Sequence, residues 1–202
     1  MTLWRERQPL IIASQSAVRR SLLANAGIPV EAIPADVDER AIQQSSGLTD
    51  PGEIAGLLAG EKAKFVSIKH PGRYVIGADQ TLALGERLFS KPANRAAAAA
   101  QIGLLAGQTH ALHSAVSVTK DGVSLFSHVS VARMTMRHLT ESEIAAYIDE
   151  AGDAVTASVG AYQLERTGVH LFERIEGDHF TILGLPLLPL LGFLRSRNLL
   201  AV

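Results

Sequence analysis

The feature that most constrains the fold is an apolar run that ends at a serine and passes into a helix within a few residues. Leu10 to Ala13 is uniformly apolar, which predicts a buried strand over about 9–13. Ser16 is a typical N-cap residue, and the pattern after it predicts a helix over 17–26 that Gly27 ends. Strand and helix signals that alternate in this way indicate an α/β protein.

The alternation continues along the chain. A second strand is expected over about 30–35, Asp50 and Pro51 open a helix to about Ile68, and an apolar strand over 74–78 ends at Asp79. The remaining expected elements are a hairpin at Gly85-Glu86, a helix over 95–106 capped by Asn94, a hairpin at Asp121-Gly122 between strands over 109–119 and 123–134, a helix from the Thr140 capping box to about Glu150, a strand pair around Gly177-Asp178 and a C-terminal helix. We therefore expect a mixed sheet with flanking helices in a single domain over 1–202, since the chain shows no repeat, linker or boundary.

Charge and composition exclude several classes of function. Nineteen Lys and Arg residues against 20 Asp and Glu residues give a net charge of −1, which argues against a protein that binds nucleic acid or a membrane surface. The sequence has no cysteine, so disulfides, thiolate catalysis and cysteine zinc sites are excluded. No signal peptide is expected, and the uncharged run over 180–194 is too short and too interrupted by Pro and Gly to span a membrane. The expected location is the cytoplasm.

Two arginines lie in the first turn of the helix over 17–26. The free N–H groups and positive dipole end of that turn favour anions, so Arg19 and Arg20 add positive charge where a phosphate commonly binds. Helical periodicity places Arg19 inside the apolar arc of the helix and Arg20 at its edge. Arg19 therefore fits either an anion site with Ser14 or a structural salt bridge with a buried stem.

Two carboxylates follow predicted strands. Asp79 closes an apolar strand, where open α/β sheets bind their ligands, although an Asp there also caps the next turn. Glu39 ends the acidic run Asp36-Val37-Asp38-Glu39, which by itself predicts a solvated loop rather than a site. Together Glu39 and Asp79 offer the oxygen ligands that Mg²⁺ prefers.

Lysines provide further candidates for phosphate contacts. On the helix over 51–68, Glu61 projects into the apolar face and Lys62 lies beside it, which fits an internal Glu–Lys pair or a lysine that reaches a phosphate. Lys91 precedes Pro92 in a loop, where most lysines face solvent. The P-loop, dinucleotide-binding and nucleophile-elbow patterns are absent, and the seven histidines show no metal-ligand spacing.

Six motifs in order resemble the Maf family of nucleoside triphosphate pyrophosphatases, and they span the chain from Leu10 to about Arg195. They are Ala13-Ser14-Gln15-Ser16-Ala17-Val18-Arg19-Arg20, Asp36-Val37-Asp38-Glu39, Glu61-Lys62-Ala63, Gly77-Ala78-Asp79-Gln80, Ser90-Lys91-Pro92 and Gly184-Leu185-Pro186.

The resemblance implies a cytoplasmic homodimeric enzyme with an elongated mixed sheet and flanking helices around a deep nucleotide-binding cleft. It implies cleavage between the α- and β-phosphates of a modified or non-standard nucleoside triphosphate, with Mg²⁺, Mn²⁺ or Co²⁺ as cofactor. Catalysis is expected from Glu39, Lys62 and Asp79, with Glu39 and Asp79 holding the metal. The expected substrate contacts are Ser14, Ser16, Arg19, Arg20, Gln80, Lys91 and Glu165.

The preferred base is less constrained than the reaction. Gly160-Ala161-Tyr162 resembles the branch of the family that acts on dTTP and UTP. Gln80, Glu165 and Leu171-Phe172-Glu173-Arg174 resemble the branch that acts on 7-methyl-GTP, and we expect that substrate class. Because the family was first associated with septum formation, a non-catalytic nucleotide-binding regulator of cell division is the alternative from another class.

Overall fold

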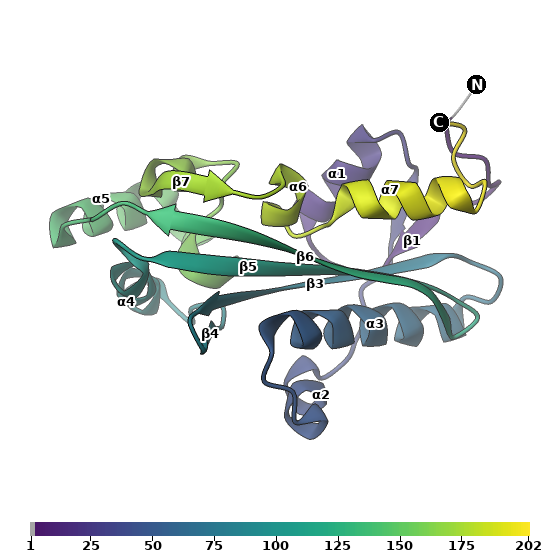
Figure 1. Ribbon diagram of the computed structural model, residues 1–202, viewed down its shortest axis with the longest axis horizontal. Helices are drawn as coiled ribbons and strands as arrows, with labels where there is room; N and C mark the ends of the chain where they lie inside the picture. The colour runs from purple at the N-terminus through teal and green to yellow at the C-terminus, as the bar shows by residue number, and fades with distance from the viewer. Residues whose placement is uncertain (1–2) are drawn as a thin grey trace. The chain divides into compact units, whose positions relative to one another are not determined.

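A mixed sheet of seven strands runs through the computed structural model, which describes residues 3–202 (Figure 1). The strand order is β2-β1-β3-β5-β6-β7, and β4 pairs with β3 outside this path. β1 pairs in parallel with β2 and β3, whereas the β3–β4 and β6–β7 pairs are antiparallel. The predicted mixed α/β sheet with flanking helices is confirmed.

The element bounds are the following. The strands are β1 (Leu10–Ile12), β2 (Val30–Ala32), β3 (Val75–Leu84), β4 (Arg87–Phe89), β5 (Thr109–Lys120), β6 (Val123–Met136) and β7 (Phe172–Glu176). The α-helices are α1 (Ala17–Asn25), α2 (Glu39–Ser46), α3 (Pro51–Lys69), α4 (Arg95–Leu105), α5 (Glu141–Ala151), α6 (His179–Ile182) and α7 (Leu187–Ser196). Three short 3₁₀ segments are η1 (Gly152–Thr156), η2 (Val159–Ala161) and η3 (Thr167–Leu171). None of the helices between residues 3 and 202 is long and apolar enough to cross a membrane.

Contacts group the chain into two compact units. Unit 1 comprises the described residues up to Gln80 together with Ser114–Ser130 and Leu183–Val202, and unit 2 comprises Thr81–His113 and Val131–Ile182. The long strands β3, β5 and β6 each contribute residues to both units. The expectation of one domain over 1–202 stays a prediction.

Unit 1 has helices on both sides of its strands, with α2 and α3 on one side and α1 and α7 on the other (Figure 1). One apolar cluster joins β1 and β3 to α3 and consists of Ile11, Ala13, Ala63, Val66 and Val75. α3 approaches β3 very closely at Gly77, where a Cβ atom would lie 1.9 Å from the carbonyl oxygen of Ala59. Only glycine tolerates this approach, so the sequence fixes how near α3 lies to the strand.

Unit 2 has an apolar core of its own. Leu82, Ile102, Leu105, Met134 and Met136 are fully buried in it. A polar pair lies in the same core, because the ring of His110 is hydrogen-bonded through Nε2 to the Tyr162 hydroxyl at 2.7 Å. Burial lowers the pKa of His110 to about 4, so the imidazole is neutral at pH 7.

Local start signals predicted most helices correctly. Ser16 accepts a hydrogen bond from the backbone N–H of Arg19 at the start of α1, Asp50 caps α3, and Asn94 caps α4. Both bonds of the predicted capping box are present at Thr140. The hairpin at Asp121-Gly122 is confirmed, with positive φ values of 52° and 76°.

Three predictions of secondary structure were wrong. β3 does not end at Asp79 but continues to Leu84, so this carboxylate lies in the middle of a strand. No second strand follows Gly177, since the chain passes into the short helix α6, where Asp178 accepts from the backbone N–H of Thr181. The acidic run is also not a simple loop, because Asp38 caps α2 and Glu39 is the first residue of that helix.

Candidate active site

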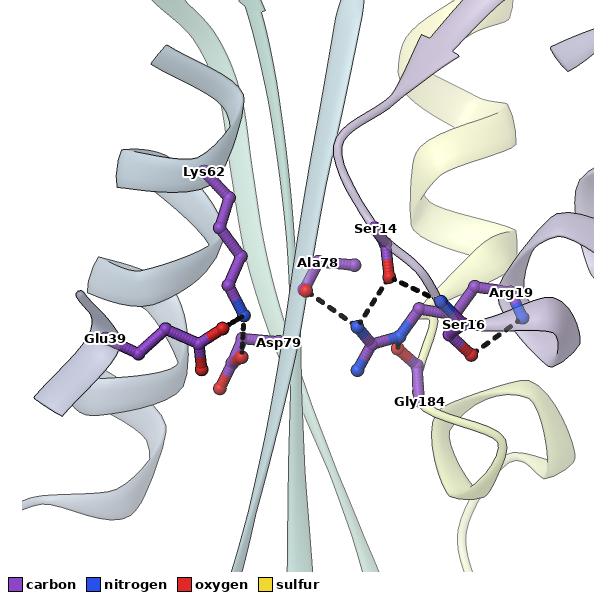
Figure 2. A network of polar contacts seen from close by, with 8 residues as sticks. All are labelled: Ser14, Ser16, Arg19, Glu39, Lys62, Ala78, Asp79 and Gly184. Carbon is purple, nitrogen blue, oxygen red and sulfur yellow. Dashed lines mark hydrogen bonds and ion pairs between the residues drawn. The ribbon is translucent and has the colours of Figure 1, made fainter. Parts of the chain in front are cut away.

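One ammonium group joins two carboxylates in unit 1. Lys62 Nζ lies 2.6 Å from Asp79 Oδ1 and 2.8 Å from Glu39 Oε1 (Figure 2). The side chains of Lys62 and Asp79 are 10% and 11% exposed, whereas that of Glu39 is 53% exposed. A buried ammonium needs a partner, and here it has one buried and one accessible carboxylate.

The close approach of α3 to β3 places Lys62 over the strand. Side chains two residues apart on a strand share a face, so Asp79 points to the same side as Gly77, where α3 lies. Lys62 comes three residues after Ala59, which is the residue whose carbonyl packs on Gly77. Glu39 reaches the same ammonium from the first turn of α2, which packs against α3.

Arg19 binds three separate segments of unit 1. Its Nε donates to the Gly184 carbonyl at 2.7 Å, and its Nη1 donates to the Ala78 carbonyl at 2.8 Å and to Ser14 Oγ at 3.3 Å (Figure 2). The guanidinium therefore holds the end of β1, the middle of β3 and the segment before α7 together. For Arg19 the sequence left open an anion site or a structural salt bridge. The structure shows a structural role, but through hydrogen bonds to carbonyls rather than through a salt bridge.

These bonds continue the ladder between β1 and β3 beyond the end of β1. Ile11 N–H donates to the Tyr74 carbonyl and Ala13 N–H donates to the Ile76 carbonyl. The next carbonyl on this edge, two residues on, belongs to Ala78 and accepts from Arg19 Nη1 at 2.8 Å instead. A side chain of α1 thus replaces a strand residue beside Asp79.

The surroundings of Arg19 combine burial with negative charge. Arg19 as a whole keeps some solvent exposure, but protein atoms surround its guanidinium. This burial lowers the pKa of Arg19, whereas the negative charges of Asp79 and Glu39 raise it. Gly184 has φ +86°, and a Cβ atom there would lie 3.2 Å from Arg19 Nε. Glycine is therefore required at position 184 both by backbone conformation and by the approach of the arginine.

Two serines shape the start of α1 next to Arg19. Ser14 is 8% exposed, and its Oγ accepts from the backbone N–H of Ser16 at 3.2 Å. Ser16 Oγ in turn accepts from the backbone N–H of Arg19 at 3.3 Å. The predicted residues Ser14, Ser16 and Arg19 are thus brought together at a positive helix end.

The other predicted contact residues are Arg20, Gln80, Lys91 and Glu165. Arg20 donates to the Gln15 carbonyl at an exposed position and takes no part in the Arg19 network. Gln80 follows Asp79 on β3, and its amide donates to Ser114 Oγ at 2.9 Å. Lys91 and Glu165 are exposed residues of unit 2.

The chemistry of the donors fits a hard divalent cation. Glu39 and Asp79 converge on one cationic atom, and Mg²⁺ commonly takes one or two protein carboxylates with water and substrate phosphate as its other ligands. Within residues 3–202 no group of three or more His, Cys, Asp or Glu side chains could hold a metal. A cation here would take its carboxylate ligands from Glu39 and Asp79, and water and substrate phosphate are the natural candidates for the others.

Sequence reasoning missed the backbone groups of this site. The carbonyls of Ala78 and Gly184 orient Arg19, and Ser114 binds Gln80, but none was predicted to do so. Every residue has a backbone carbonyl, so the residue type does not indicate which carbonyl will accept a hydrogen bond. The one available signal was Gly184 itself, within a motif that was noted without a role.

Comparison with known proteins gives relatives along the entire chain. Residues 9–197 match the family described as "Maf-like protein". Proteins named "Nucleoside triphosphate pyrophosphatase" from Rhodopseudomonas palustris (strain ATCC BAA-98 / CGA009) and Bradyrhizobium diazoefficiens are 68% and 67% identical, over 100% of both chains. A "7-methyl-GTP pyrophosphatase" from Brucella abortus is 51% identical, over 94% of this chain and 96% of its own.

A solved structure gives a much looser likeness. The nucleoside-triphosphatase, or dITP/XTP pyrophosphatase, of Mycobacterium abscessus aligns with a TM-score of 0.37 and 18% identity, over 64% of this chain and 73% of its own. A likeness of that degree supports no conclusion about activity. The match over residues 9–197 and the full-length relatives are sufficient, and this chain belongs to the Maf family.

Proposed function

We propose that this protein hydrolyses nucleoside triphosphates between the α- and β-phosphates, releasing a nucleoside monophosphate and pyrophosphate. The observation that carries the proposal is the buried ammonium of Lys62 between Asp79 and Glu39, close to the Arg19 network. The names of the full-length relatives support the same reaction class.

The positive groups have a clear use in this reaction. Phosphoryl transfer depends mainly on positioning and on neutralising charge in the transition state. We assign Lys62 and Arg19, with the hydroxyls of Ser14 and Ser16, to binding the triphosphate, and we expect Lys91 to contact its phosphates as well. We assign Arg20 only a peripheral contact with the substrate, because it lies outside the hydrogen-bond network of Arg19.

The carboxylates provide the other half of the chemistry. Asp79 either orients and deprotonates the attacking water or binds the metal, and the proton released in hydrolysis passes to solvent. Glu39 and Asp79 would hold Mg²⁺, Mn²⁺ or Co²⁺, which would neutralise charge on the phosphates. Glu39 suits this role because half of its side chain is accessible.

We further propose a preference for guanine-type substrates, 7-methyl-GTP above all. A carboxylate only accepts hydrogen bonds, and the Watson–Crick edge of guanine offers two adjacent donors. Methylation at N7 adds a positive charge that a carboxylate such as Glu165 favours. The named activity of the Brucella abortus relative supports this choice. A preference for dTTP or UTP, in keeping with Gly160-Ala161-Tyr162, is the alternative.

The deciding experiment follows the products from GTP, 7-methyl-GTP, UTP and dTTP with Mg²⁺ and in excess chelator. We expect monophosphate and pyrophosphate in equal amounts, with no activity in chelator. Release of orthophosphate, or full activity in chelator, would contradict the proposal. Nucleotide binding without turnover on any substrate would instead favour the regulator, and sedimentation of the same sample would test the predicted homodimer.

A further inference from the structure

We propose that Lys62 takes the place of the divalent cation while the nucleotide is absent, so that metal and phosphate bind cooperatively. This inference rests on the proposed function, since it concerns the same Glu39 and Asp79. Glu39, Lys62 and Asp79 would couple the binding of the metal to the binding of the nucleotide phosphate. Hydrolysis alone does not require such coupling.

The geometry places a cation where the metal's ligands meet. Lys62 Nζ contacts Asp79 Oδ1 at 2.6 Å and Glu39 Oε1 at 2.8 Å, so one ammonium engages both carboxylates at once (Figure 2). A divalent cation bound to the same oxygens would lie within a few ångströms of this ammonium, and the two like charges would repel. The free protein should therefore bind the metal weakly.

The ammonium has little opportunity to withdraw into solvent. The Lys62 side chain is only 10% exposed and emerges from α3, which Gly77 holds against β3. A phosphate oxygen at the site would give Nζ a new acceptor and release the carboxylates to the metal. The metal would in turn gain phosphate oxygens as ligands, and these matter because residues 3–202 offer no group of three or more His, Cys, Asp or Glu side chains that could hold it.

Glu39 is placed to change partners in this exchange. It lies on α2, a helix without a single buried residue, and its own side chain is 53% exposed. When Glu39 leaves, Lys62 keeps its ion pair with Asp79, so the buried ammonium is not left without a partner. Asp79, on the central strand β3, is the fixed ligand, and Glu39 is the one that moves.

The test measures Mn²⁺ binding to the protein without turnover, from the electron paramagnetic resonance signal of free Mn²⁺. Without nucleotide, Lys62→Met should bind Mn²⁺ about tenfold more tightly than the unchanged protein, within the usual range of coupling between sites. Lys64→Met, which removes the same charge from an exposed position of α3, should leave the affinity unchanged. Adding Asp79→Asn to Lys62→Met should abolish the gain.

A second measurement needs no variant and so does not depend on the folding of Lys62→Met. GMP should tighten Mn²⁺ binding to the unchanged protein about tenfold, after correction for Mn²⁺ held by GMP alone, because coupling is reciprocal. Failure of GMP to do so, or equal gains in Lys62→Met and Lys64→Met, would overturn the inference. Cooperative binding in a protein that releases no pyrophosphate would reject the proposed function and leave the coupling intact.

Discussion

At the scale of single residues, neighbours in sequence have very different surroundings. Arg19 is enclosed by the backbone of three segments, whereas Arg20 makes one exposed contact to the Gln15 carbonyl. Helical periodicity predicted this difference, because it placed Arg19 in the apolar arc of α1 and Arg20 at its edge. The identity of the partners was not predictable, since they are carbonyl oxygens from distant parts of the chain.

The two arginines should therefore contribute unequally to catalysis. Arg19→Ala should lower kcat/KM by about 10²-fold, because a desolvated charge contact to phosphate is lost. Arg20→Ala is the matched control, with the same chemistry removed one residue away, and should stay near the unchanged protein. Steady-state kinetics on the preferred triphosphate decide this, and equal losses in the two variants would show that Arg19 has no special part.

Asp79 should matter through its charge rather than its shape. Asp79→Asn keeps an oxygen for Lys62 but removes the negative charge, and turnover should fall by about 10²-fold or more, as when a proton-transfer group is lost. Glu61→Gln, which neutralises the neighbouring carboxylate on α3, serves as the control and should retain activity. Turnover of Asp79→Asn at the level of the unchanged protein would remove Asp79 from the mechanism.

His110 predicts an acid limit to stability. Burial lowers its pKa to about 4 in the folded state, against about 6.5 when unfolded, so the unfolded chain binds the proton more readily. Stability should be unaffected above pH 6.5 and should decline as the pH falls from there toward 4, by about 2 kcal/mol at pH 5. Urea unfolding at pH 7.5 and pH 5 measures this loss, and His110→Gln should show a smaller loss if His110 is its source.

At the scale of elements, local signals were reliable and distant contacts were not. The caps of α1, α3 and α4 follow from residues within one turn of each helix, so the sequence predicted them. α2 escaped notice because none of its residues is buried and Ala41 and Ile42 are its only apolar residues. The end of β3 was misplaced because a lysine from α3 neutralises Asp79 and allows a carboxylate inside a strand.

The contact between α3 and β3 yields a prediction about stability. Gly77→Ala would place a methyl group 1.9 Å from the Ala59 carbonyl oxygen, so α3 must shift, at a cost of about 3 kcal/mol or more. The shift should also move Lys62 and lower activity. Urea unfolding gives the stability of the variant.

Gly60→Ala is the control on the same helix, because nothing lies within 4 Å of the added methyl group. It should stabilise the protein by up to about 1 kcal/mol, since alanine favours a helix interior over glycine. A Gly77→Ala variant as stable as the unchanged protein would show that α3 can move away from β3 without loss of stability.

At the scale of the whole molecule, the candidate site was only partly predictable from sequence. Glu39, Lys62 and Asp79 meet in unit 1 although they come from three elements. Their positions after strands and on a helix face made them candidates, and the family resemblance was needed to choose among the alternatives. Periodicity alone could not choose between Glu61 and Lys62. Lys91 and Glu165 belong to unit 2, and their part in catalysis stays a prediction.

Base preference is the prediction that involves unit 2. If Glu165 selects the base, Glu165→Gln should reduce kcat/KM for 7-methyl-GTP relative to UTP, because an amide adds a donor and removes the negative charge. Glu173, another exposed acid of unit 2, changed to Gln, controls for a general loss of charge. A ranking of GTP, 7-methyl-GTP, UTP and dTTP that Glu165→Gln leaves unaltered would exclude Glu165 as the selector.

The position of Arg19 has a consequence for folding. Where β1 ends, β3 would present a carbonyl without a donor at Ala78, a residue that is fully buried, and a buried carbonyl left unpaired costs free energy. The guanidinium supplies the donor that a longer β1 would otherwise provide. The same side chain that is positioned for phosphate thus completes the hydrogen bonding of the sheet, so Arg19 would be worth keeping for stability even in a relative that had lost its activity.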